Sequence, residues 1–200
     1  DTGTSFTCTF QAAKMKRGQR WINSSGHASM GYALPGAIGA HYATGKRVVC
    51  IVGDGSLQMN LQELSTIAHN KLPITIFVLN NGGYLTIKLM QDNHYDRRVG
   101  SDEDSGLSCP RTQHIANAYG IHSYLVIHHA ELKTMLDNMD SWDWPCVTEI
   151  MMDPEQKLIP RIASYKAPDG SMRSSPLEDM SPLLDRDEFA SNMIVPVWEG

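Results

Sequence analysis

The sequence predicts an α/β domain of three layers, α/β/α, in which helices cover both faces of a mostly parallel β-sheet. Two apolar runs rich in β-branched residues, 47–52 and 74–79, predict strands buried on both faces, since neither run alternates with polar residues. Between them, apolar residues recur at helical spacing from Leu57 to Asn70, which predicts a single helix of about 14 residues. A strand, a helix and a strand in this order make the two strands parallel, with a right-handed crossover.

Further elements flank this unit on both sides. Before it, apolar residues at helical spacing follow Tyr32, Pro35 lies in the first turn, where proline is tolerated, and Gly45 ends the helix. After it, the pattern predicts a short helix ending at Gly120, a strand at 124–127, a helix at 132–139 and a strand at 147–151. This alternation of strands and helices is typical of an α/β fold.

Two stretches lack a regular pattern. Residues 91–110 are polar and rich in turn-forming residues, and the sequence leaves open whether they form a mobile loop over a site or a plain solvated connection. Beyond Pro154, prolines recur and the regular elements become short. We therefore expect a domain over residues 1–155 and an irregular C-terminal arm over residues 156–200 that packs on the domain or on a partner. The first residues show neither an initiator methionine nor a signal-peptide pattern, so we expect a fragment or a processed product.

The composition excludes several classes of protein. The chain is 42% hydrophobic and 20% charged, which is typical of a globular protein and argues against a disordered one. Its formal net charge of −5 argues against nucleic acid or an anionic membrane as the main partner. No apolar run approaches the roughly 20 residues that cross a bilayer. Four cysteines without CxxC spacing argue against a zinc site and favour a cytoplasmic location, with Cys50 as a small core residue.

Polar side chains follow both predicted strands of the central unit. Asp54 comes after the first strand and Asn81 after the second. Neighbouring parallel strands lie about 4.8 Å apart and end at the same edge of the sheet, so the two side-chain oxygens could bind one cation. Carboxylate and amide oxygens suit Mg²⁺, which binds at about 2.1 Å. Gly55 and Ser56 open a helix, whose free N–H groups favour an anion.

Taken singly, Asp-Gly and Asn-Gly are common turn dipeptides and carry little functional information. Their joint placement at two parallel strand ends is far more specific, and it predicts a site for a divalent metal and a diphosphate. The residues alone leave open a non-catalytic module that binds a magnesium nucleotide or phosphate with the same geometry.

The motif also resembles that of a known family. Gly53-Asp54-Gly55-Ser56, followed by Asn80-Asn81 after the next strand, resembles the GDG…NN signature of thiamine diphosphate enzymes. The segments 30–40 and 53–70 are similar to acetolactate synthase-like members. The resemblance extends over residues 1 to about 150, and it implies the C-terminal, diphosphate-binding domain of a longer enzyme, with thiamine diphosphate and Mg²⁺ as cofactors.

The resemblance implies a role for each matching residue. Asp54, the side chain of Asn81 and the backbone carbonyl of Gly83 would bind Mg²⁺. Met30 would force the cofactor into a bent shape, and the carbonyl of Ala28 with the N–H of Met30 would hold its aminopyrimidine ring. Without the flanking match, core packing would be the simpler interpretation of Met30. The implied cofactor-binding residues are Thr4, Ser5, Ala28, Met30, Gly53, Gly55, Ser56, Asn81, Gly83 and Tyr84.

The implied reaction is decarboxylation of a 2-keto acid such as pyruvate, followed by carboligation to a carbonyl acceptor, by a transferase or lyase that is a homodimer or homotetramer. In the family, a glutamate on the N-terminal pyrimidine-binding domain activates the cofactor. No glutamate here matches its motif, so this chain alone is expected to be inactive.

The chain departs from acetolactate synthases in two segments, one that contacts the diphosphate in relatives and one that shapes the pocket of the second substrate. Acetolactate synthases usually have a Gln-His-Gln run where this chain has Thr4 and Ser5, and a Gln-Gly-Met-Val segment after the asparagine pair, where this chain has the run 82–88. The segments 102–110 and 174–180 look more like thiamine enzymes encoded beside bacterial surface-polysaccharide genes. A simple 2-keto acid decarboxylase and a keto-sugar acyl transferase therefore remain alternatives, and the acceptor and any flavin requirement stay open.

Overall fold

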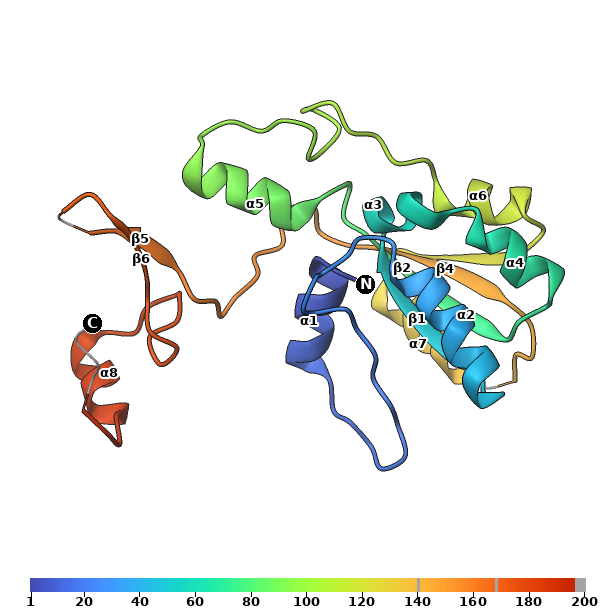
Figure 1. Ribbon diagram of the computed structural model, residues 1–200, viewed down its shortest axis with the longest axis horizontal. Helices are drawn as coiled ribbons and strands as arrows, with labels where there is room; N and C mark the ends of the chain where they lie inside the picture. The colour runs from blue at the N-terminus through green and yellow to red at the C-terminus, as the bar shows by residue number, and fades with distance from the viewer. Residues whose placement is uncertain (140, 168, 197–200) are drawn as a thin grey trace. The chain divides into compact units, whose positions relative to one another are not determined.

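The computed structural model describes residues 1–139, 141–167 and 169–196 (Figure 1). The chain divides into two compact units, residues 1–156 and residues 157–200. The first unit contains the predicted strand–helix–strand unit and the residues of the predicted site.

The first unit is built on a four-stranded sheet whose strands are all parallel. The strand order is β1-β2-β4-β3, and the strands are β1 (Val48–Gly53), β2 (Ile74–Asn80), β3 (His122–Val126) and β4 (Cys146–Met151). β1 and β2 are neighbours, with Val48 opposite Ile74 and Gly53 opposite Leu79. The parallel strand–helix–strand unit is therefore confirmed, and the carboxyl ends of its two strands lie side by side.

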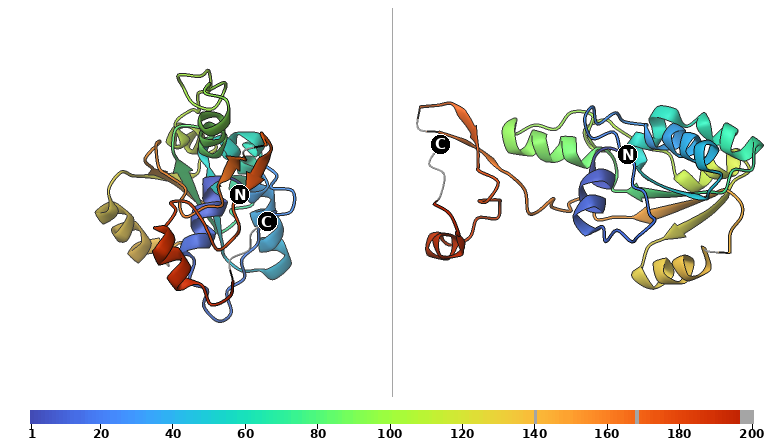
Figure 2. Two further views of the ribbon diagram at one scale, coloured as in Figure 1. Left: turned by 90° about the vertical axis from the view of Figure 1, so that its left-hand side faces the viewer. Right: turned by 60° about the horizontal axis from the view of Figure 1, so that its bottom comes forward.

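Helices cover both faces of this sheet, which confirms the α/β fold. Val52, Ile76 and Val147 lie on one face and belong to the larger core cluster. That cluster also holds buried residues of α2 (Ala33–Thr44), α4 (Glu63–His69) and α6 (Thr112–Ala118). On the other face, Phe77 and Cys146 pack with residues of α7 (His129–Met139). Figure 2 shows α7 on the side of the sheet opposite α2 and α4.

The connection between β1 and β2 corrects the prediction of one continuous helix. It consists of α3 (Asp54–Leu57), a 3₁₀ turn η1 (Gln58–Asn60) and α4. At the break, Asn60 Nδ2 donates a 2.8 Å hydrogen bond to the carbonyl of Gly31, in the loop before α2. The apolar spacing predicted the buried face correctly, but it carries no information on this contact with a distant loop.

Two helices lack a sequence signal that we recognised. α1 (Thr4–Ala12) is rich in threonine, a residue with a low helix propensity, and its first two residues are its buried ones. α5 (Leu85–His94) buries only Leu85 and Lys88, so its sequence shows little amphipathic pattern. Lys88 Nζ donates to the carbonyl of Pro154 and to Glu155 Oε1, at 2.8 Å from the latter. Tertiary contacts, rather than local pattern, define both helices.

The polar stretch at 91–110 is not a plain solvated connection along its whole length. Its first residues belong to α5, and Ser101 is 1% exposed. The carbonyl of Ser101 accepts a 2.8 Å hydrogen bond from Tyr84 N, and Gly83 and Asp102 form an antiparallel bridge. The middle of the stretch therefore packs against the chain that follows β2.

The second unit has short elements, as the recurring prolines predicted. β5 (Ser164–Lys166) and β6 (Met172–Ser174) form an antiparallel pair. α8 (Arg186–Asn192) is capped by Asp185, whose Oδ1 accepts a 2.9 Å hydrogen bond from Asp187 N. The Arg186 guanidinium pairs with Asp179 and lies 4.9 Å from the centre of the Phe189 ring. The start of α8 is thus held by local polar contacts beside the buried aromatic residue Phe189.

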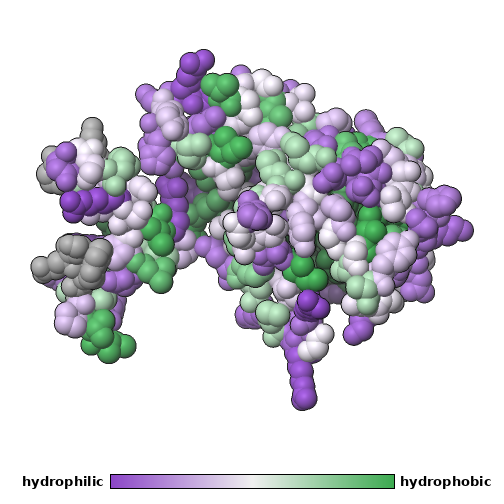
Figure 3. Space-filling view, in the orientation of Figure 1, coloured by the Kyte–Doolittle hydropathy of each residue, from purple (hydrophilic) through white to green (hydrophobic). Residues whose placement is uncertain are grey.

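The surface of the first unit fits its composition. In the view of Figure 3, hydrophilic residues are interspersed with scattered apolar ones over this unit, and the mean hydropathy of the chain is −0.29. Among the helices that the structure describes, none is both long enough and apolar enough to cross a membrane.

Candidate metal and cofactor site

The two polar residues at the strand ends are brought together as predicted. Asp54 directly follows β1 and Asn81 directly follows β2, and both side chains are buried. Gly83 N donates a 2.9 Å hydrogen bond to Asp54 Oδ2, so the loop after β2 contacts the carboxylate after β1. The register of the two strands produces this contact, because it aligns Gly53 with Leu79 at the same edge.

Each of these side chains keeps one buried oxygen without a hydrogen-bond partner among the described residues: Asp54 Oδ1 and Asn81 Oδ1. The other end of the Asn81 amide is engaged, because its Nδ2 donates a 3.2 Å hydrogen bond to Thr4 Oγ1. An unsatisfied buried polar group costs about 1–3 kcal/mol. One cation bound to both oxygens would remove that cost, and this donor set suits Mg²⁺.

The electrostatics of Asp54 fit a cation bound beside its carboxylate. Burial raises the pKa of Asp54 to about 6, although the backbone N–H groups of Gly55 and Gly83 act in the opposite direction. A carboxylate in such surroundings is stabilised in its charged form by a cation at the free oxygen. The geometry and the charge of the site therefore both fit a bound divalent metal.

The start of α3 lies under an aromatic ring. A Cβ atom on Gly55 would overlap Cε1 and Cδ1 of the Tyr84 ring, so a larger residue at this position would displace that ring. Ser56, the next residue, is buried. Burial raises the pKa of Tyr84, with Cys109 and Asp54 as further causes, and it raises the pKa of Cys109 to about 11. Cys109, which no sequence pattern indicated, therefore lies near the same carboxylate.

The loop before α2 places the two residues predicted to hold the pyrimidine ring. Ala28 is exposed and has a positive φ of 50°. Met30 is only half-buried and stands outside the core, so simple core packing does not describe it. Gly31 N donates to Asp1 Oδ1 at 3.2 Å, and a Cβ atom on Gly31 would stand 2.6 Å from Met59 Cβ. The turn at Met30 is thus fixed against the chain that follows α3.

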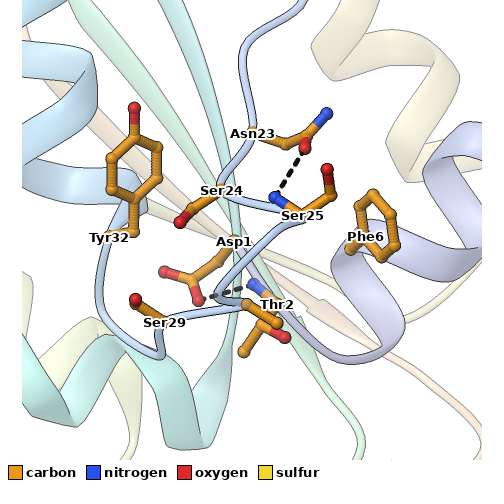
Figure 4. Close-up of a pocket in the computed structure, with 9 residues that line it drawn as sticks. Asp1, Thr2, Phe6, Asn23, Ser24, Ser25, Ser29 and Tyr32 are labelled. Carbon is orange, nitrogen blue, oxygen red and sulfur yellow. Dashed lines mark hydrogen bonds between the residues drawn. The ribbon is translucent and has the colours of Figure 1, made fainter.

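Asp1 links this loop to the N-terminal segment. Its carboxylate accepts hydrogen bonds from Thr2 N at 2.7 Å and from Ala33 N at 2.9 Å, in addition to Gly31 N. Figure 4 shows Asp1, Thr2 and Phe6 lining a small pocket together with residues of the loop. Thr4, which contacts Asn81, follows in the same N-terminal segment. The structure therefore connects the predicted pyrimidine residues with the predicted metal residues.

Comparison with known proteins decides the family. The family model for thiamine pyrophosphate enzymes, C-terminal TPP binding domain, matches residues 1–150 of this chain. The chain belongs to this family. Membership in the thiamine pyrophosphate enzymes confirms the resemblance seen in the sequence, and it implies thiamine diphosphate and Mg²⁺ as the cofactors.

The most similar relatives include large subunits of acetolactate synthase. That of Cyanidium caldarium is 35% identical over 168 residues, which are 84% of this chain and 28% of that protein. That of isozyme 2 of Escherichia coli K12 is 32% identical over 166 residues, which are 82% of this chain and 29% of that protein. Isozyme 3 of the same organism is 40% identical over 119 residues, 59% of this chain and 20% of that protein. The chain thus spans less than a third of the length of these relatives.

Several residues of this thiamine pyrophosphate domain were missed by sequence reasoning. Asp1 and Asn60 hold the loop around Met30, and neither belongs to a pattern that we recognised. Glu149 is fully buried in β4 and accepts a hydrogen bond from Asn80 Nδ2. An acidic residue inside an apolar strand was the available signal for Glu149, because a charge is rarely buried without a partner.

Proposed function

We propose that this chain binds Mg²⁺ and the diphosphate of thiamine diphosphate at the carboxyl ends of β1 and β2. Asp54, the Asn81 amide oxygen and the carbonyl of Gly83 are the proposed metal ligands. One observation carries the proposal: two buried oxygens without a partner in the described part of the chain follow two neighbouring parallel strands. A bound cation explains why the fold keeps both.

The other residues implied by the family are proposed to surround this metal site. Backbone N–H groups at the start of α3 bind the diphosphate, and Ala28 and Met30 hold the pyrimidine ring. When bound, thiamine diphosphate supplies the carbanion chemistry of the reaction. The residues of this chain bind and orient it. The residues proposed to line the diphosphate are Thr4, Ser5, Gly53, Gly55, Ser56 and Tyr84.

For the whole protein we propose an acetolactate synthase-like activity, in which a 2-keto acid is decarboxylated and its acyl unit is joined to a carbonyl acceptor. The activating glutamate would come from a domain outside this chain, so the chain alone would not turn over. The proposed assembly is a homodimer or homotetramer in the cytoplasm. The run 82–88 differs from acetolactate synthases, which keeps a simple decarboxylase and a keto-sugar acyl transferase as alternatives for the acceptor step.

A calorimetric comparison tests the cofactor assignment against a magnesium nucleotide module. Titration of the full-length protein with thiamine diphosphate in the presence of Mg²⁺ is expected to show saturable binding that EDTA abolishes. Titration with ATP and Mg²⁺ under the same conditions is expected to show binding at least about tenfold weaker. A preference for ATP would overturn the assignment.

The contact between Thr4 and Asn81 yields a separate prediction. Thr4→Val keeps the shape of the side chain but removes the acceptor of Asn81 Nδ2, so the amide is free to turn its oxygen away from the metal. The loss of one hydrogen bond, about 1 kcal/mol, predicts about fivefold weaker Mg²⁺ binding in a titration with thiamine diphosphate present. Thr7→Val is the matched control, since the Thr7 hydroxyl donates only to the Gly3 carbonyl of the same helix start. Equal Mg²⁺ affinities for the two variants would contradict this role of Thr4.

A further inference from the structure

A fully buried carboxylate lies one strand away from the proposed metal ligands. Glu149 belongs to β4, is 0% exposed and stands opposite Val78 of β2. Its Oε1 accepts a 2.6 Å hydrogen bond from Asn80 Nδ2. Its Oε2 has no hydrogen-bond partner within the described residues. Burying a carboxylate that is only half satisfied is unfavourable, so packing alone does not account for this residue.

The strand pairing explains why Glu149 meets Asn80. Side chains alternate along a strand, so Asn80 lies on the same face of β2 as Val78, and Glu149 lies on that face of β4. Asn80 is held at two further points. Its Oδ1 accepts a 3.0 Å hydrogen bond from Gly82 N, and its carbonyl accepts a 2.8 Å hydrogen bond from Met152 N. Glu149 therefore fixes a residue whose side chain accepts a hydrogen bond from within the turn after β2.

That turn carries the proposed metal ligands. Asn81 lies between Asn80 and Gly82, and Gly83 N donates to Asp54 Oδ2. The run from Asn80 to Gly83 is thus fixed at its first residue by Glu149 and at its last by Asp54. If Glu149 is removed, Asn80 loses the acceptor of its amide group, and the turn is free to adopt other conformations.

We propose that Glu149 is a positioning residue for the metal site. Acting through Asn80, it orients the turn that presents Asn81 Oδ1 and the Gly83 carbonyl to the cation. This inference rests on the proposed function of the site and adds a residue that makes no contact with the proposed ligands in the described hydrogen bonds.

Substitutions at Glu149 separate positioning from mere stability. Glu149→Leu removes the acceptor, whereas Glu149→Gln keeps an oxygen that can accept from Asn80 Nδ2. Thr148→Val is the matched control: Thr148 is equally buried on the same strand, but its side chain points to the other face, where it contacts Cys146. If Glu149 served only the stability of the fold, Glu149→Leu would lower the unfolding temperature, as Thr148→Val would, and leave the affinity for the metal unchanged.

The experiment measures metal binding directly in the full-length protein. Mn²⁺ replaces Mg²⁺, thiamine diphosphate is present, and free Mn²⁺ is followed by electron paramagnetic resonance. Glu149→Leu is expected to weaken Mn²⁺ binding about tenfold or more, as loss of a ligand-orienting partner does. Glu149→Gln and Thr148→Val are expected to stay within about threefold of the unsubstituted protein. Unchanged Mn²⁺ affinity in Glu149→Leu would overturn the inference.

Substitution of Asn80 is the second test. It also tests the positioning role of Glu149 if Glu149→Leu fails to fold. Asn80→Ala is expected to weaken Mn²⁺ binding at least as much as Glu149→Leu, because it breaks the same hydrogen bond and also the one that Gly82 N donates to Asn80 Oδ1. The double variant is expected to lose no more affinity than Asn80→Ala alone. Unchanged affinity in Asn80→Ala, or additive losses in the double variant, would overturn the inference. Absence of Mn²⁺ binding by the unsubstituted protein would instead overturn the proposed metal site, and this inference with it.

Discussion

Replacing Asp54 by alanine is expected to weaken Mg²⁺-dependent binding of thiamine diphosphate about a hundredfold or more. Asp54 is the only acidic side chain among the proposed ligands, and its Oδ1 is buried without a hydrogen-bond partner among the described residues. Loss of a charge-bearing contact of about 3 kcal/mol corresponds to a factor of this size. Calorimetric titration of the full-length protein with thiamine diphosphate, at fixed Mg²⁺, measures the loss.

The fold of the Asp54→Ala variant is expected to survive. Asp54 stands at the end of β1, outside both apolar clusters, and burial already disfavours its charged form. Asp92→Ala is the control, because Asp92 is an exposed carboxylate of α5 that pairs with Arg98. Circular dichroism should be unchanged for both variants, and only Asp54→Ala should lose cofactor. Binding by Asp54→Ala within about threefold of the unsubstituted protein would place the metal elsewhere.

Replacing Gly83 by alanine is expected to have the largest effect on the structure of the site. Gly83 has a φ of +135°, a conformation that side-chain-bearing residues rarely adopt. An added Cβ would overlap the Ser101 carbonyl oxygen and stand 3.1 Å from Leu107 Cδ2. We expect the free energy of unfolding to fall by about 3 kcal/mol, from backbone strain and overpacking together. Denaturant titration of the metal-free protein measures this change.

Two neighbouring glycines serve as controls for Gly83→Ala. Gly82 and Gly100 also have positive φ, of 77° and 60°, but a Cβ on either meets no atom of the described chain within 4 Å. Gly82→Ala and Gly100→Ala should therefore cost only backbone strain, about 1 kcal/mol each. If Gly83→Ala costs no more than these two, the packing of the Ser101 segment on the loop is not what constrains Gly83.

The sequence was sufficient to predict the structure where residues close together in the chain determine it. The β-branched runs defined β1 and β2, and the helix between them made these strands parallel, so Asp54 and Asn81 had to end at one edge. The apolar spacing also identified the buried face of the crossover, including Leu57, Leu64 and Ile67. It could not show that this crossover breaks into α3, η1 and α4, because the same spacing fits a continuous helix.

The sequence was insufficient where residues far apart in the chain meet. The hydrogen bonds of Thr4 to Asn81, and of Asn80 to Glu149, each join segments separated by more than sixty positions. α1 and α5 have weak local patterns and form on tertiary contacts, so their positions were missed. The packing of Ser101 on Gly83 likewise depends on where the polar stretch returns to the sheet.

By itself, the sequence determined the α/β fold, the family and the two strand ends at which an acid and an amide stand. These depend on periodicity and on short motifs, which are properties of contiguous residues. Only the tertiary structure decided that one oxygen of each side chain is buried without a described partner, and that Thr4 and Glu149 hold the amide groups around them. Burial and hydrogen-bond satisfaction are set by the surrounding atoms, which come from every part of the folded unit.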